Sequence, residues 1–323
     1  MINQVNFHKL ESEFTTDGRT FSAHITAGGR NDEMIIPISD LATHIGVACI
    51  IVQIIFTILF RYILPHGPWT ALSGFTAHKI VCLPSMLLLT CIGCRDWFFY
   101  TNTYNDGTAI DRIWGEYNAH DIPLAYGIGA MLLWDIPMSI LSPPMHDPFM
   151  LAHHVMMFLV AYSMSGGFCG TGRFIGYYYA PFYFGVIELS SIPLTYVNIF
   201  HPKQIPYHEW TKTKQSNPRL ESLRLLITKS NEIARVAFAA TFLLLRGLYF
   251  PYVSFCMCLP DLITAYKAPP HGVPMATGYF LISSIFTFSC LQAYWGILVA
   301  KQVIKAVRTG KAEIHVENRN KGE

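Results

Sequence analysis

Charged residues are scarce in this sequence. Asp, Glu, Lys and Arg make up 14% of its 323 residues, whereas soluble globular domains carry roughly 25%. Hydrophobic residues reach 52%, so the composition argues against an ordinary soluble domain and indicates a protein that crosses a membrane several times. The net charge of +2 is too small for the basic surface that nucleic-acid binding requires. We therefore expect no nucleic-acid partner.

The sequence also lacks a signal peptide and a complete set of zinc ligands. Residues 1–40 are polar and mixed in charge, without the short apolar core of a signal peptide. We expect them to form a polar segment ahead of a first span that stays in the protein as an anchor. Cys91 and Cys94 form a C-x-x-C pair, but no second pair supplies the remaining zinc ligands. Because buried free cysteines behave as small hydrophobes, we expect these two to pack.

Long apolar runs are what the sequence does contain. A membrane-crossing helix needs about 20 mostly apolar residues, and seven segments meet this requirement. They are 41–60, 80–100, 122–142, 148–166, 174–200, 235–256 and 277–300. The predicted fold is therefore all-α, a polytopic membrane helix bundle with seven transmembrane spans. The fourth and fifth segments are the least uniform, because they contain histidines and a glutamate.

The orientation follows from the distribution of Lys and Arg, which gather on the cytosolic side of membrane proteins. With seven spans, the loop at 201–234 and the C-terminal tail fall on one side, and both are rich in Lys and Arg. We therefore expect a cytosolic C-terminus and a luminal N-terminus.

Ionisable side chains inside spans usually face the bundle interior or a wet cavity. Counting about 1.5 Å per residue from the cytosolic ends places Asp135, His153 and His154 at one depth. The short loop at 142–147 makes their two helices antiparallel neighbours. We therefore expect Asp135 to orient one imidazole. Between the two histidines, His154 is the better candidate for a cavity and His153 for packing.

The same count places Glu188 and Arg246 at nearly equal depths, so we predict that they contact each other. On the fifth span, Ser191, Thr195 and Asn198 follow Glu188 at helical spacing. On the fourth span, Tyr162 follows His154 along one stripe. We take these residues as candidates for lipid or substrate binding. For Ser191 and Thr195, helix packing is an equally physical alternative.

Adjacent histidines point about 100° apart on a helix, so both cannot easily bind one ion. The histidine clusters of membrane di-iron enzymes, such as H-x-x-x-H, are absent. We expect neither a metal nor any other bound cofactor.

The stretch "HHVMMFLVAYSMSGG" (153–167), followed by "GVIELSSIPLTYVNIFH" (185–201) and "LLLRGLYFP" (243–251), resembles the TLC domain family, which includes the ceramide synthases. The resemblance covers residues 70–305. It implies a six-helix barrel with a cavity open toward the cytosol, a leading helix at 41–66, a cytosolic tail at 306–323, and residence in the endoplasmic reticulum. The paired aspartates of ceramide synthases are missing here. The likeness is therefore to TLC domain-containing proteins outside that branch.

This resemblance implies a role in membrane lipid homeostasis, with membrane lipids as partners and a lipid or acyl chain in the cavity. One alternative is an acyltransferase in which His153 or His154 acts as a base, Asp135 orients it, and acyl-CoA is the co-substrate. Another is a trafficking or biogenesis factor of the endoplasmic reticulum. The sequence leaves catalysis, the identity of the lipid and homo-oligomer formation open.

Overall fold

The computed structural model describes residues 38–100, 107–115, 121–168, 173–201, 203–214 and 217–320, with side chains up to residue 308. Nearly all of the predicted polar segment 1–40 lies outside the described residues. Every regular element in the described ranges is helical, which confirms the all-α class. Five helices are long and apolar enough to cross a membrane: Ile38–Ile63, Ser73–Phe99, Ile122–Leu141, Pro218–Ala265 and Met275–Arg308.

These spans consist of α-helices that often continue as π-helical turns. The longer elements are α1 (Ile38–Ile58) with η1 (Leu59–Ile63), α3 (Ser73–Arg95) with η2 (Asp96–Tyr100), α5 (Asp121–Ala130) with η4 (Met131–Asp135) and α6 (Ile136–Leu141), α7 (Pro148–Met164), α11 (Pro218–Thr241) with η8 (Phe242–Tyr249), η9 (Tyr252–Cys258) and α12 (Leu259–Ala265), and α13 (Met275–Asn320). The shorter elements are α2 (Pro68–Ala71), α4 (Ala109–Trp114), η5 (Pro143–Met145) and α10 (Ile205–Lys212).

The fourth and fifth predicted spans differ from the other five. Helix α7 is apolar but has only 17 residues. The expected continuous helix over 174–200 is wrong, because this region contains four short elements: η6 (Tyr177–Tyr179), α8 (Ala180–Phe184), η7 (Val186–Ser190) and α9 (Ser191–Ile199). Gly176, with φ of +64°, precedes η6, and Gly185 separates α8 from η7. The count of seven spans therefore stays a prediction.

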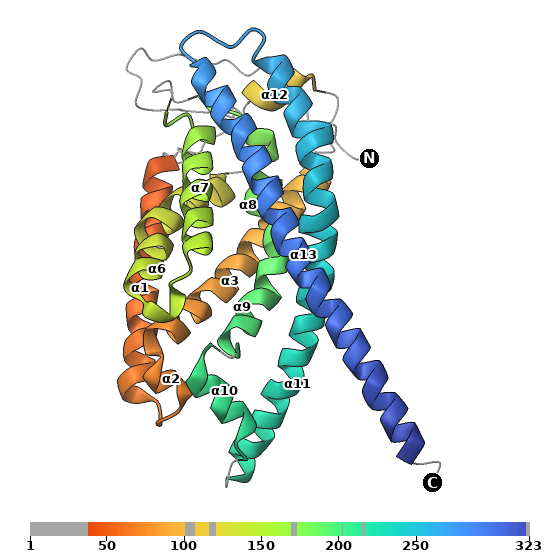
Figure 1. The fold of residues 1–323 in the computed structure, drawn as a ribbon. Helices are drawn as coiled ribbons and strands as arrows, with labels where there is room; N and C mark the ends of the chain where they lie inside the picture. Colours follow the sequence, from red (N-terminus) through yellow and green to blue (C-terminus); the bar gives the residue numbers. More distant parts are fainter. Residues whose placement is uncertain are drawn as a thin grey trace, which may run out of the picture.

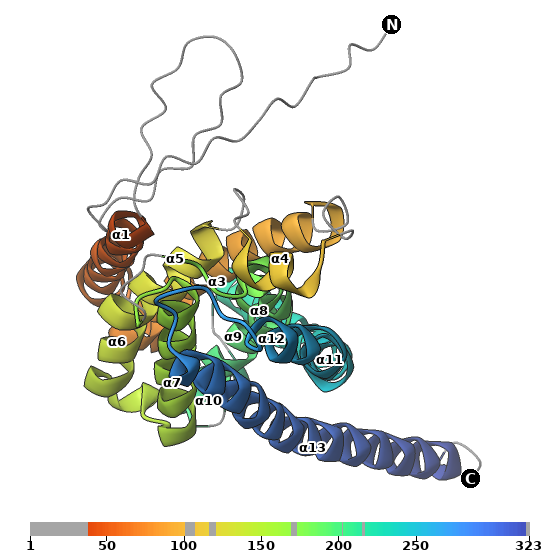
Figure 2. The same ribbon diagram turned by 90° about the horizontal axis from the view of Figure 1, so that it is seen from above.

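Helix α3 runs tilted through the middle of the bundle, as Figure 1 shows, and contacts α8, η7 and α9. Helix α1 stands at one edge, against α5 and α3 (Figure 2). Helix α13 crosses the bundle, and its C-terminal part extends beyond the other helices (Figures 1 and 2). Its contacts with α7 and η8 close that side of the bundle.

One end of the bundle is filled by apolar side chains and is tied by an ion pair. The main buried cluster includes Tyr178, Phe182 and Val253. Beside it, the guanidinium of Arg112 donates to both carboxylate oxygens of Asp261, over 2.5 Å and 2.7 Å. Tyr179 Oη also donates to this carboxylate. These bonds join α4, η6 and α12 at the end opposite α10.

Gly93 of α3 and Gly185 allow two backbones to meet. A Cβ added to Gly93 would lie 2.5 Å from the Cα of Gly185 and 2.6 Å from the carbonyl oxygen of Pro181. Real Cβ atoms do not approach backbone atoms this closely, so any larger residue would push α3 away from the break at Gly185.

We predict that Gly93→Ala lowers stability by about 1–3 kcal/mol, the usual cost of overpacking a filled interior. The thermal unfolding midpoint of the detergent-purified protein, followed by tryptophan fluorescence, measures this effect. Gly74→Ala is the matched control on the same helix, since nothing lies within 4 Å of its added Cβ. Equal midpoints for the two variants would contradict the close approach.

Candidate active site in an intramembrane cavity

A cavity of about 470 Å³ lies in the half of the bundle that faces the α6–α7 and α9–α10 connections. Small-molecule pockets typically enclose about 300–1,000 Å³, so this cavity is large enough for part of a lipid. Its walls come from α3, α5 to α6, α7, η7 with α9, η8 and α13. The site residues therefore come from segments far apart in the sequence.

The carboxylate of Asp135 is the centre of the polar wall. Its Oδ2 lies 2.5 Å from His154 Nδ1, and its Oδ1 lies 2.7 Å from His78 Nε2. Asp135 is 4% exposed and His78 is 2% exposed. The predicted Asp135–His154 contact is therefore present, and a second imidazole binds the other carboxylate oxygen.

The backbone at Asp135 is unusual for a helix. Asp135 ends the π-helical turn η4, and Pro137 follows in the first turn of α6. Proline lacks the N–H that an α-helix would use at this position, and π-turns inside helices are frequent at functional sites. The wider turn positions Asp135 between α3 and α7.

Helix α7 begins where the sequence predicts. Asp147 caps it by accepting from the backbone N–H of Phe149 and Met150, over 3.0 Å and 3.3 Å. Pro148 occupies the first helical position, which suits its fixed φ and missing N–H. His154 then lies two turns into the helix, level with Asp135.

Sequence reasoning missed His78. The predicted span began at residue 80, so His78 was left outside the membrane, whereas α3 begins at Ser73. The same depth count from residue 73 would have placed His78 near Asp135. Its ring stacks on Trp134, with centroids 4.6 Å apart, and its Nδ1 lies 3.4 Å from Cys82 Sγ.

His153 has different surroundings from His154. Its ring meets Phe288 and Trp295 of α13 edge-on, at centroid distances of 5.5 Å and 5.4 Å, which agrees with the packing role expected for it. It also lines the cavity. Its Nδ1 is buried and has no hydrogen-bond partner among the described residues.

The predicted Glu188–Arg246 contact is confirmed. Arg246 Nη2 lies 3.6 Å from Glu188 Oε1. The guanidinium also donates to Ser190 Oγ over 2.7 Å and to Ser191 Oγ over 3.0 Å. Arg246 is 5% exposed, and these three partners compensate the cost of burying its charge.

The remaining candidates separate into two groups. Ser191, Thr195 and Asn198 line the cavity together with Glu188 and Arg246. Tyr162 does not: it is 37% exposed, and its ring packs on Phe158 and Phe168. Eight residues of α-helix turn it about 80° away from His154. We therefore correct the placement of Tyr162 in the cavity.

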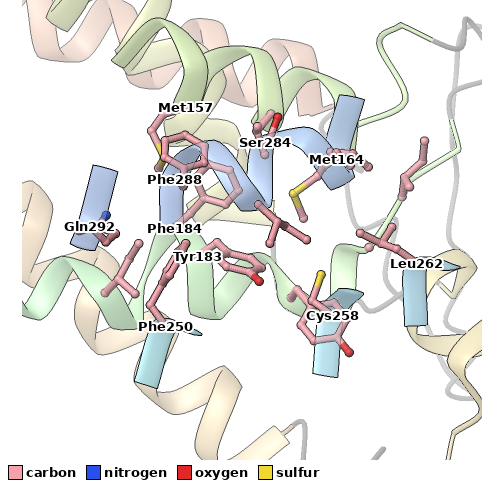
Figure 3. Close-up of a pocket in the computed structure, with 17 residues that line it drawn as sticks. Met157, Met164, Tyr183, Phe184, Phe250, Cys258, Leu262, Ser284, Phe288 and Gln292 are labelled. Atoms are coloured by element: carbon pink, nitrogen blue, oxygen red, sulfur yellow. The ribbon is translucent and has the colours of Figure 1, made fainter. Parts of the chain in front are cut away.

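A smaller apolar pocket of about 60 Å³ adjoins the cavity. Met157 and Phe184 belong to both walls. Figure 3 shows its lining, in which Phe288 and Phe250 lie near one end and Cys258 and Leu262 near the other. The polar cavity thus has a small apolar pocket, the apolar recess, directly beside it, an arrangement that suits a molecule with a polar head and a hydrocarbon tail.

Basic groups lie at the other margin of the cavity, where Lys79 and Lys203 contribute to the lining. His201 lies close to Lys203. Burial, and then the nearby charges of Lys203, Arg235 and His208, lower the pKa of His201. A neutral imidazole there leaves the lysines as the cationic groups of this margin. Within the described ranges, no three His, Cys, Asp or Glu side chains are grouped to hold a metal ion.

The carboxylate determines what the two imidazoles can do. An ionised carboxylate only accepts hydrogen bonds, so His78 presents its Nε2–H to Asp135 and keeps a lone pair on Nδ1. His154 Nδ1 lies 2.5 Å from the other carboxylate oxygen but is not aligned for a hydrogen bond. In its neutral form His154 also carries a lone pair on one ring nitrogen. Such a nitrogen can accept a proton, and the carboxylate stabilises the resulting imidazolium. The arrangement is therefore suited to general-base chemistry.

Fold and site together define an all-helical membrane protein with a histidine–aspartate centre inside its bundle. The TLC domain model (TRAM_LAG1_CLN8) matches residues 76–301, the greater part of the chain. This chain belongs to the TLC domain family. Comparisons with curated proteins and with solved structures gave no match.

We predict that Arg246→Gln costs about 3–5 kcal/mol of stability, because it leaves the partly buried Glu188 without its cation. The double variant Glu188→Gln/Arg246→Gln should cost less than the single variant. Thermal midpoints of the wild type, both single variants and the double variant form a double-mutant cycle. Strictly additive losses would show that the two side chains do not interact.

Proposed function

We propose that this protein is a lipid-metabolic enzyme that transfers an acyl group from acyl-CoA to an amine or hydroxyl of a membrane lipid. The observation that carries the proposal is the contact of His154 with Asp135 in the wall of a cavity that lies beside an apolar recess. His154 Nε2 takes the proton of the acceptor as the acceptor attacks the thioester carbonyl. Asp135 stabilises the imidazolium that forms.

The basic groups at the margin of the cavity support acyl-CoA as the acyl donor. Coenzyme A carries phosphates, and Lys79 and Lys203 provide positive charge where the cavity wall meets the α9–α10 connection. The hydrocarbon chain would extend toward Met157, Phe184 and the apolar recess. In the same arrangement, Glu188, Ser191, Thr195 and Asn198 would meet the polar head of the acceptor lipid.

The acyltransferase proposal is more specific than a role in lipid homeostasis through lipid binding alone. A cavity with an apolar recess serves a bound lipid without any reaction, so binding without turnover is the competing function. A trafficking or biogenesis role is the third candidate.

We also propose residence in the endoplasmic reticulum, with the N-terminus luminal and the C-terminus cytosolic. This orientation opens the basic margin toward cytosolic acyl-CoA.

We predict that His154→Ala lowers acyl transfer by about 10²–10⁴-fold, the usual contribution of a general base. The measurement is transfer from labelled acyl-CoA by purified protein, supplied with lipid acceptors that carry an amine or a hydroxyl. His44→Ala is the matched control, because His44 is exposed on α1 and its Nδ1 lies 2.6 Å from the backbone carbonyl oxygen of Asp40 on the same helix. It should leave turnover unchanged.

Lipid identification by mass spectrometry on the same preparation separates binding from chemistry. A wild-type protein that retains lipid but shows no turnover with any acceptor would contradict the enzymatic proposal. It would leave lipid binding as the function. Unchanged turnover of His154→Ala would show that His154 is not the base.

The proposed orientation has its own test. A short tag fused after Glu323 should be cut by protease added outside intact microsomal vesicles. A tag that is protected until detergent opens the vesicles would contradict a cytosolic C-terminus.

A further inference from the structure

The guanidinium of Arg246 is held along one edge and open at its third nitrogen. Nε donates to Ser190 Oγ over 2.7 Å, while Nη2 donates to Ser191 Oγ over 3.0 Å and lies 3.6 Å from Glu188 Oε1. Nη1 has no hydrogen-bond partner among the described residues, and it is not one of their fully enclosed polar atoms. Because Arg246 lines the cavity, the N–H groups of Nη1 are the donors that it offers to a ligand.

The neighbours of Arg246 fix the direction of this open nitrogen. Ser190 and Ser191 lie at the junction of η7 with α9, and they hold the guanidinium from that side. The ring of Phe242 lies 6.0 Å from Arg246 Cζ. Arg246 is 5% exposed, so its side chain has little room to rotate. A donor that is oriented before the ligand arrives needs no rearrangement during a reaction.

Arg246 lies in the same cavity as the histidine–aspartate centre. The charges of Arg246 and His153 are near enough to act on each other, and the same holds for Glu188 and His154. All four residues line the cavity. A substrate that fills this space therefore meets both the imidazole of His154 and the open nitrogen of the guanidinium.

The charge balance around Arg246 selects the kind of group that fits. Glu188 already neutralises Arg246, and Asp135 contributes a second carboxylate to the cavity wall. A phosphate or carboxylate at Nη1 would be repelled by these two groups, whereas Lys79 and Lys203 at the margin are free of that repulsion. A carbonyl carries no net charge, and its oxygen accepts hydrogen bonds. The site therefore favours a neutral carbonyl over an anion.

We propose that Arg246 Nη1 binds the carbonyl oxygen of the acyl thioester and stabilises the negative charge that develops on this oxygen. Arg246 is then a catalytic residue, and Glu188, Ser190 and Ser191 position it. The inference rests on the proposed acyl transfer and completes it, since His154 removes the proton of the acceptor while Arg246 stabilises the oxygen.

The reaction needs no reactant beyond acyl-CoA and the acceptor lipid. The amine or hydroxyl attacks the carbonyl carbon while His154 takes its proton, and the electron pair of the C=O π bond moves onto the oxygen. Nη1 donates to this oxyanion. The C=O bond then re-forms, and the bond from carbon to the sulfur of coenzyme A breaks. The departing thiolate takes the proton from His154, which leaves an amide or ester and free coenzyme A.

Arg246→Lys is the first test, because lysine keeps a positive charge beside Glu188. Its single nitrogen cannot reproduce the bonds to both serines and also bind a ligand. We expect kcat with palmitoyl-CoA to fall about 10²–10³-fold, the usual effect of removing one oxyanion donor, while KM for palmitoyl-CoA changes far less. Arg235→Lys is the matched control, since Arg235 is exposed on α11, and it should leave kcat unchanged. Thermal unfolding midpoints verify that both variants are folded.

Infrared spectroscopy gives a second readout that requires no turnover. The probe is a palmitoyl-CoA analogue in which a methylene group separates the sulfur from an isotope-labelled ketone, so that it cannot transfer its acyl group. A hydrogen bond from a cation weakens a C=O bond and lowers its stretching frequency. We expect a lower frequency on the wild-type protein than on Arg246→Lys. Arg235→Lys should match the wild type.

The outcomes distinguish the two proposals. Wild-type turnover with equal carbonyl frequencies on wild type and Arg246→Lys would overturn the role of Arg246 and leave acyl transfer standing. This holds even where turnover of the variant falls, because a purely structural role of Arg246 does not involve the carbonyl. Absence of wild-type turnover with every acceptor would overturn acyl transfer and the catalytic role together. A frequency that still depends on Arg246 would then support the carbonyl contact as a binding site.

Discussion

A single carboxylate shared by two imidazoles organises the polar half of this protein. Asp135 is nearly inaccessible, and an unpaired charge there would cost several kcal/mol. His78 and His154 relieve this cost from opposite oxygens, which ties α3 and α7 to the end of η4. The shape of the cavity wall and the placement of both imidazoles depend on this arrangement.

The two ends of the bundle have different side chains and different tasks. The end with Arg112, Asp261 and Tyr179 is packed and cross-linked by charge-assisted bonds, so it holds the helices in place. The other end encloses space and lines it with polar groups. A bundle that is firm at one end can keep a cavity at the other without losing the alignment of its helices.

Much of the site could be predicted because the end of a span and the rise per residue of an α-helix together determine how deep a side chain lies in the membrane. This simple count paired Asp135 with His154 and Glu188 with Arg246. It failed where a boundary or a helix was misjudged. His78 was missed because α3 begins seven residues before the predicted start. Tyr162 was misplaced because a residue two turns further along an α-helix no longer points in the same direction as His154. The break lies at Gly185, where the backbone closely approaches Gly93, and the pattern of hydrophobic residues does not reveal this approach.

Helix α1 precedes the segment matched by the family, yet it takes part in the order of the site. Gln53 donates to the carbonyl of Gly74 over 2.9 Å and accepts from Trp134 Nε1 at 3.4 Å. Trp134 in turn stacks on His78. The segment that matches the family model, residues 76–301, is therefore shorter than the segment whose contacts hold the site in place, because that segment includes α1. A chain trimmed to residues 76–301 would keep the reactive groups and lose the brace that orders them.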